Sequence, residues 1–152
     1  EMSAPRSTER ARSGQSGPVL IEQDVATAAE WISTALSSSG YRADFSLGSL
    51  REIDRFFDEQ TRKGKAVKRG LLSEGLGQRM FGIGSYVGEV IRRHAGGTWK
   101  GDEDDPLVEI NVTLVLDVCA VIWPMQRVMK RFKNGREDSI AAYGAALVVE
   151  NP

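Results

Sequence analysis

The stretch LLSEGLGQRMFGIGSYVGEVIRRHAGGTW, residues 71–99, decides the fold of this chain. Its apolar residues recur every three or four positions, which predicts one long helix of about 24 residues with an apolar stripe. The stripe consists of Leu72, Leu76, Met80, Ile83, Val87, Val90 and Ile91. Charged residues interrupt the run, so it is not a membrane span. Gly96 and Gly97 supply the C-terminal cap that ends such a helix.

This helix is unusual in its glycines. Gly70, Gly77 and Gly84 are seven residues apart, and Gly88 follows on nearly the same face. Each glycine inside a helix costs about 1 kcal/mol relative to alanine, so several together need a physical reason. We predict that a backbone or a large side chain packs directly against this row.

The composition is that of one ordinary globular domain. Of the 152 residues, 41% are hydrophobic and 27% are charged, and the formal net charge is −1. This balance gives no global attraction to nucleic acid or anionic membranes. Cys119 is the single cysteine and cannot form an intramolecular disulfide, which fits a reducing compartment. We find no signal peptide, and we expect a cytoplasmic protein.

The N-terminal residues differ in composition from the rest. Residues 1–19 are rich in Ser, Arg, Gly and Pro, so we predict a disordered tail followed by a single domain over residues 20–152. Asp24 is a good N-cap, and a first helix is expected over about residues 24–38.

A second helix is expected over about residues 49–61. Ser49 and Glu52 have the Ser-x-x-Glu spacing of a capping box, which marks its start. Asp54 and Asp58 lie opposite its apolar side and are expected to face solvent.

The C-terminal half predicts three strands and two helices. The strands are expected at residues 98–101, 107–116 and 118–123, and the helices at residues 124–134 and from about residue 137 onward. The fold class is therefore α+β. It has N-terminal helices that include the long glycine-rich one, a small antiparallel sheet of about three strands, and two C-terminal helices.

Glu89 is the first candidate for chemistry, because a carboxylate on the buried flank of the long helix needs a partner. We predict an ion pair with Lys130 or Arg131, with Tyr86 and Trp99 excluding water around it. An acid/base site with a shifted pKa is the alternative, and structural pairing is favoured over it.

Other reactive residues have simpler interpretations. His94, the single histidine, is expected to interact with the C-terminal end of the long helix. Cys119 is expected to be a buried apolar residue within a strand. The acidic run of residues 102–105 and the basic run of residues 62–69 are interpreted as solvated loops. We expect no metal and no cofactor.

Two motifs carry a resemblance. GSYVGEVI (84–91) with GGTW (96–99) resembles G-x-Y-x-G-E-x-I followed by G-G-x-W, and PMQRVMKRFKNGREDS (124–139) resembles P-x-x-x-V-x-K-R-x-x-N-G-x-E-D-S. The chain is similar to a family of small bacterial proteins of unknown function, which implies a cytosolic α+β domain. The matching positions are Gly84, Tyr86, Gly88, Glu89, Gly97, Trp99, Pro124, Val128, Lys130, Arg131, Asn134, Gly135, Glu137, Asp138 and Ser139.

Seven residues are candidates for binding, namely Tyr86, Glu89, Trp99, Lys130, Arg131, Asn134 and Asp138. The favoured function is a non-enzymatic protein-interaction domain with a protein partner, and an immunity or antitoxin-like inhibitor is one specific form. The alternative is a small-ligand-binding protein or enzyme with a cleft around Glu89. A nucleic-acid binder that uses the basic segments is the weaker alternative. A flat apolar or charged patch would favour the first class, and a pocket lined by converging polar groups would favour the second. A one-sided basic face would favour the third.

Overall fold

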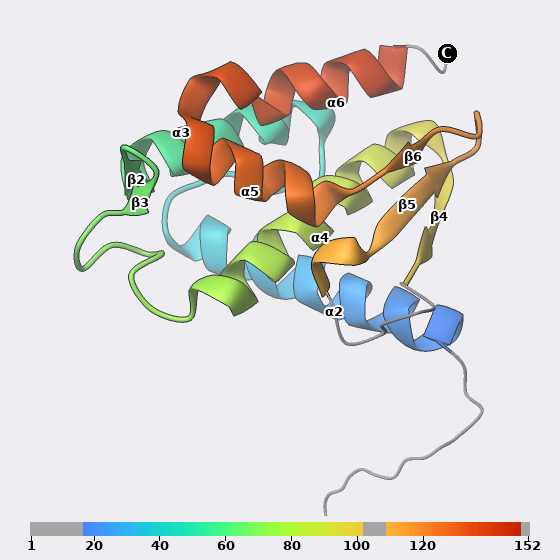
Figure 1. The fold of residues 1–152 in the computed structure, drawn as a ribbon, viewed down its shortest axis with the longest axis horizontal. Helices are drawn as coiled ribbons and strands as arrows, with labels where there is room; N and C mark the ends of the chain where they lie inside the picture. Colours follow the sequence, from blue (N-terminus) through green and yellow to red (C-terminus); the bar gives the residue numbers. More distant parts are fainter. Residues whose placement is uncertain (1–16, 102–108, 150–152) are drawn as a thin grey trace, which may run out of the picture.

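The computed structural model describes residues 17–101 and 109–149, and it has an α+β fold (Figure 1). Its helices are α2 (Gly17–Ser38), α3 (Leu50–Gln60), α4 (Leu76–Ala95), α5 (Pro124–Asn134) and α6 (Ile140–Val149). Its strands are β2 (Thr61–Arg62), β3 (Lys65–Ala66), β4 (Gly97–Lys100), β5 (Thr113–Leu116) and β6 (Val121–Ile122). Short 3₁₀ turns lie at Leu47–Ser49, Glu109–Asn111 and Gly135–Asp138.

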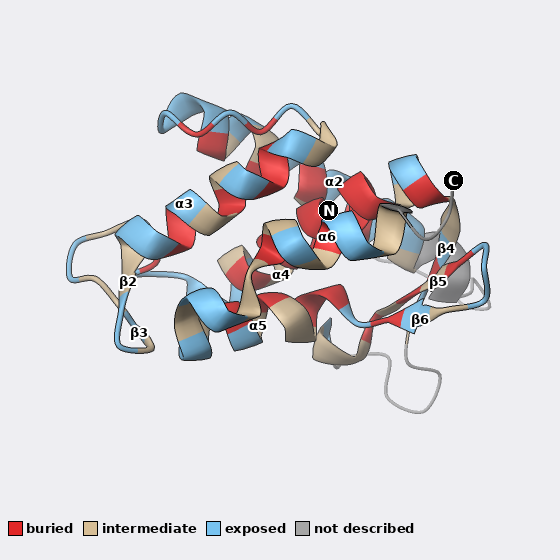
Figure 2. Cartoon of the chain, turned by 90° about the horizontal axis from the view of Figure 1, so that it is seen from above, coloured by how far each residue is buried: buried red, intermediate tan, exposed pale blue. Residues whose placement is uncertain are grey.

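Helix α4 is the expected long helix, and it lies between α2 and α5 at the centre of the molecule (Figure 1). Most of its residues from Met80 to Ile91 are buried, and Figure 2 shows buried residues on the sides of the helices that face one another. It begins at Leu76 rather than near residue 72. Gly75 has a left-handed backbone with φ of 62°, and the Arg79 guanidinium donates to the carbonyls of Leu71 and Glu74.

Two glycines of α4 confirm the predicted close approach. A Cβ at Gly84 would lie 2.9 Å from the Cα of Met125, and one at Gly88 would overlap the Trp99 ring. Gly77 does not fit the prediction, since nothing lies within 4 Å of the equivalent point. Gly70 lies in a turn before the helix begins.

The three-stranded antiparallel sheet has the order β4-β5-β6, with Trp99 opposite Leu114 and Val115 opposite Val121. Its strands are shorter than expected. Residues 109–111 of the predicted strand 107–116 form a 3₁₀ turn, and residues 107–108 lie outside the described part.

The turn between β5 and β6 overturns the expectation for Cys119. The Cys119 amide donates to Leu116, and the Leu116 amide donates to Ala120, which closes a hairpin with residues 117–119 as its loop. Cys119 holds the left-handed position of this loop with φ of 69°, where glycine is common, and its side chain is exposed rather than buried.

The N-terminal boundary was also wrong. Helix α2 begins at Gly17, so Asp24 lies inside the helix and does not cap it, and residues 17–19 are helical rather than a tail. Residues 1–16 lie outside the described part of the chain.

The predicted capping box at the start of α3 does not form. Ser46 caps the preceding 3₁₀ turn by accepting from the Ser49 amide, while the Ser49 hydroxyl donates to the Ser46 carbonyl. Glu52 instead accepts from the Arg42 amide and from Arg55. The Ser-x-x-Glu spacing is present at Ser49 and Glu52, but the capping side chain is that of Ser46, three residues before Ser49.

The basic run of residues 62–69 is partly a hairpin rather than a linker. Thr61 pairs with Ala66 and Arg62 pairs with Lys65. Lys63 and Gly64 form the tight turn with φ of 52° and 77°, the left-handed pair that a two-residue hairpin loop requires.

Among the described residues, no helix is both long enough and apolar enough to cross a membrane.

The glycine contacts predict opposite effects for two matched substitutions. Gly84→Ala should destabilise the fold by about 1–3 kcal/mol, because its methyl group meets the backbone of Met125. Gly77→Ala should be neutral or stabilise by up to about 1 kcal/mol, since alanine is the better helix former and the space is open. Urea denaturation of both variants gives the comparison. Equal stabilisation by both would contradict the close packing at Gly84.

Candidate functional site

The carboxylate of Glu89 is buried and is bound by three neighbouring side chains. Its Oε2 accepts from the Trp99 indole nitrogen at 2.7 Å and from Arg92 Nε at 2.7 Å. Its Oε1 accepts from Arg92 Nη2 at 3.0 Å and from Arg93 Nε at 3.3 Å. The expected contact with Trp99 is present, but the predicted pair with Lys130 or Arg131 is wrong, because two arginines within one turn of the same helix reach Glu89 first.

These donors keep Glu89 ionised. Burial by itself would raise the pKa of this carboxyl, but the hydrogen bonds from Arg92 and Trp99 and the charges of Arg92 and Arg93 hold the pKa below its ordinary value. A general acid near neutral pH needs a raised pKa, so this environment suits a structural anion.

Tyr86 has a structural environment of its own, separate from Glu89. Its hydroxyl oxygen accepts from the Phe45 amide at 2.9 Å and shares a hydrogen bond of 2.6 Å with the Ser49 hydroxyl. Burial raises the pKa of Tyr86, so the phenol stays neutral. It joins α4 to the loop before α3 rather than excluding water from Glu89.

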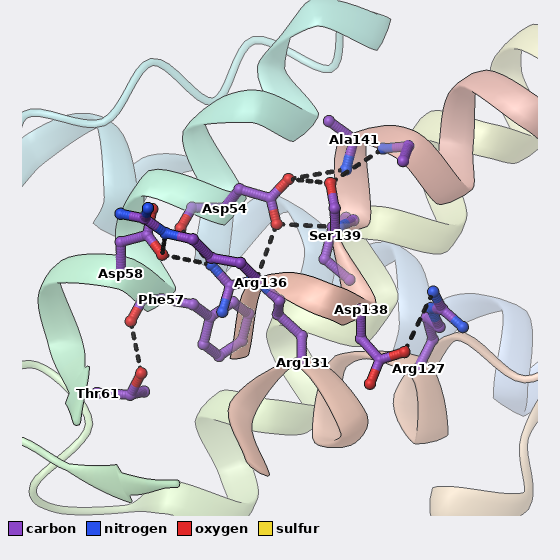
Figure 3. A network of polar contacts seen from close by, with 12 residues as sticks. Asp54, Phe57, Asp58, Thr61, Arg127, Arg131, Arg136, Asp138, Ser139 and Ala141 are labelled. Carbon is purple, nitrogen blue, oxygen red and sulfur yellow. Dashed lines mark hydrogen bonds and ion pairs between the residues drawn. The ribbon is translucent and has the colours of Figure 1, made fainter. Parts of the chain in front are cut away.

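Arg131 is almost fully buried and binds α3 (Figure 3). Its Nε donates to Asp54 Oδ1 at 2.9 Å, and its Nη2 donates to the Asp54 carbonyl at 3.0 Å and to Asp58 Oδ1 at 2.7 Å. Asp54 therefore does not face solvent as expected, whereas Asp58 is exposed as expected and still binds Arg131. The two aspartates supply the anions that compensate a buried guanidinium.

Asp54 also holds the first turn of α6 (Figure 3). Its Oδ1 accepts from the Ile140 amide, and its Oδ2 accepts from the Ser139 hydroxyl and the Ala141 amide, each at 2.9 Å. A helix leaves its first amides without partners, and here a carboxylate from a distant helix satisfies them. The motif residues Arg131 and Ser139 meet at this one side chain.

The remaining candidates lie near this network on the surface. Asn134 donates to Asp138 at 2.8 Å, and Asp138 lies 3.6 Å from Arg127 in an ion pair. Lys130 is exposed and has no ion pair with any described residue. The structure therefore places the seven candidates in separate clusters, with Glu89 and Trp99 as one contacting pair and Asn134 and Asp138 as the other.

A small cleft of about 270 Å³ lies beside Glu89, lined by Glu22, Ala26, Glu89, Arg92, Gly97 and Trp99. Both oxygens of Glu89 already accept hydrogen bonds from Arg92, Arg93 and Trp99, so this carboxylate is not free to bind a ligand in the cleft. His94 contacts its own helix near the C-terminal end, as expected, with its Nδ1 2.8 Å from the Val90 carbonyl.

A larger apolar groove lies between the first half of α4 and helix α5, and the sequence reasoning did not identify it. It has a volume of about 410 Å³ and is lined by Leu76, Gly77, Met80, Phe81, Glu109, Ile110, Met125, Met129, Phe132 and Lys133. Three methionines face this space, and methionine adapts its shape to different apolar partners. Gly77, the glycine without an internal neighbour, forms part of its wall.

The apolar surface continues beyond the groove. Phe81 and Glu109 also line a neighbouring hollow of about 550 Å³ that reaches Trp31 on α2. Trp31 and Leu76 are 43% and 38% exposed, which is unusual for large apolar side chains that cluster on one side.

Metal binding has no support in the described ranges, where no group of His, Cys, Asp and Glu side chains has the arrangement of a metal site.

Comparisons with known proteins add no relative. No family model, no curated protein and no solved structure matches the chain. The resemblance to a family of small bacterial proteins therefore stays a prediction.

The Asp54 network predicts a large effect on stability. Asp54→Ala should lower the free energy of unfolding by about 3–5 kcal/mol. The substitution removes one of the two carboxylates that bind the buried Arg131, and it also removes the cap of α6. Glu74→Ala, which removes an exposed carboxylate, is the matched control and should change stability by less than about 0.5 kcal/mol. Chemical denaturation measures both, and equal small effects would contradict the role of Asp54.

Glu89 predicts a pH dependence. Because its pKa in the folded protein lies below the ordinary value of 4.5, its contribution is present above that pH and is lost as the pH falls toward the folded pKa. Glu89→Gln should cost about 1–3 kcal/mol at neutral pH and flatten the loss of stability in acid. Denaturation curves between neutral and acid pH test this, and parallel curves for the two proteins would refute it.

Proposed function

We propose that this protein is a non-enzymatic protein-interaction domain and that the groove between α4 and α5 binds an apolar segment of its partner. The apolar lining of the groove is the observation that supports the proposal. Binding sites are commonly concave and lined mainly by apolar side chains.

A helix is the segment that the groove suits best. Two packed helices form its walls, and grooves of this kind bind the apolar face of an amphipathic helix through residues at positions i, i+3, i+4 and i+7. Gly77 allows a partner to approach α4 closely, as Met125 does at Gly84 in the same helix. The adaptable methionine side chains fit the same use.

The cleft around Glu89 supports an enzyme less well. Catalysis needs groups that are free to exchange protons or bind substrate. Glu89 already accepts from Arg92, Arg93 and Trp99, and its pKa is lowered rather than raised.

The proposal includes a cytoplasmic location, for which the single cysteine is the support. An inhibitor of the immunity or antitoxin type is one form such a domain takes, and the partner's identity distinguishes that form from others.

The test is a capture experiment with groove variants in lysates of cells that carry the gene. Leu76→Arg places a charge in the exposed part of the groove, and Gly77→Trp fills it without meeting other atoms at Cβ. Val118→Arg is the matched control, since Val118 is an exposed apolar residue on the β5–β6 turn. Quantitative mass spectrometry should show one partner lost by about tenfold or more with both groove variants and retained with the control.

Melting curves must show that all three variants fold. A partner retained by both groove variants would contradict the proposal. Loss of the partner with Val118→Arg alone would place the interface at the β5–β6 hairpin instead.

A further inference from the structure

The groove carries opposite charges at its two ends. Lys133 lines it at the C-terminal end of α5. Glu109 lines it near the start of α5, where the Gln126 side chain donates to the Ile110 carbonyl at 3.3 Å. Residues 126 and 133 are about 10 Å apart along a helix, so the two charges mark different ends.

The β2–β3 hairpin adds further positive charge to the Lys133 end. Gly64, in the turn of this hairpin, lies directly against the α5 backbone, because a Cβ there would be 2.9 Å from the Lys133 carbonyl oxygen. The contact places the hairpin that carries Lys63 and Lys65 against the C-terminal end of α5, where β2 and β3 lie in Figure 1. Lys130 is about one turn before Lys133 on α5. The sequence separates these two basic segments by more than sixty residues.

These cations are not neutralised within the described ranges. None of Arg62, Lys63, Lys65, Lys130 and Lys133 forms an ion pair there, and each is exposed. The nearest acids on α3 are already engaged. Asp58 binds Arg131 and Arg136, and Glu59 binds Tyr41 and Arg55. A chain of net charge −1 therefore concentrates unpaired positive charge at one end of its apolar groove.

We infer that the partner segment is an amphipathic helix with Asp or Glu residues clustered at one end, which lie over Lys133 and the β2–β3 hairpin while its apolar face fills the groove. This inference rests on the proposed function of the groove. Complementary charge would fix the direction in which the helix binds and would speed association.

An acidic helix accounts for more of the surface than a nucleic acid does. Phosphates would contact the lysines but leave the groove's apolar walls uncovered. No aromatic residue alternates with the basic residues of 62–69 to stack on bases, as a single-strand binder requires.

The experiment is a selection from a display library of peptides of about 18 residues, long enough for about five helical turns. Apolar residues are fixed at helical spacing and all other positions are random. Peptides selected on the full chain should carry Asp and Glu clustered toward one end. Lys63→Glu with Lys133→Glu should weaken the Kd of a selected peptide by about tenfold or more. Arg51→Glu with Lys100→Glu makes the same charge change elsewhere and should alter the Kd by less than about threefold.

Gly77→Trp separates this inference from the proposed function. Peptides that require an open Gly77 but show no charge bias would overturn the acidic partner and leave the groove's function intact. Failure to select any peptide, or binding unaffected by Gly77→Trp, would overturn both.

Two further measurements complete the test. Fluorescence anisotropy measures the binding of single-stranded and duplex DNA to the chain. The inference is overturned if DNA binds more tightly than the selected peptides and if the double variant Lys63→Glu, Lys133→Glu removes the DNA binding. Light scattering measures the oligomeric state. If the chain self-associates and Gly77→Trp prevents the self-association, a second copy of the chain occupies the groove and the inference is overturned.

Discussion

The close contact of α4 with its neighbours at Gly84 and Gly88 determines how the rest of the chain is arranged. Met125 packs on the first glycine, and the Trp99 ring and Pro124 pack on the second. One face of α4 therefore holds both the sheet, through Trp99, and helix α5, through Pro124 and Met125. A side chain at either glycine would push these elements apart, since packed interiors have little free space.

Two charged networks hold the helices once this packing is set. Glu89 joins α4 to β4 through the Trp99 indole, and Asp54 joins α3 to α5 and α6 through Arg131 and Ser139. Each network surrounds a buried charge, Glu89 or Arg131, with several hydrogen-bond partners, which offsets the cost of removing it from water. Both sequence motifs contribute to these contacts, the first through Glu89 and Trp99 and the second through Arg131 and Ser139.

The surface proposed for binding lies mostly outside the two motifs. The groove beside Gly77 begins where the close packing of α4 ends, so the same helix contributes to the core with one half and to an open apolar surface with the other. The β2–β3 hairpin contacts the end of this groove through Gly64 and Lys133 and adds positive charge to it. The apolar groove and the positive charge thus meet at the C-terminal end of α5, where the acidic end of the partner is proposed to bind.

The sequence by itself determined the fold class, the long central helix, helix α5 and the close packing at Gly84 and Gly88, because periodicity and glycine spacing act within one element. Only the tertiary structure decided which charges pair. Asp54 was expected to face solvent because it lies opposite the apolar residues of its helix, yet α5 and α6 cover it. The groove and its basic end likewise arise between segments distant in the chain, and no local pattern encodes the distance between them.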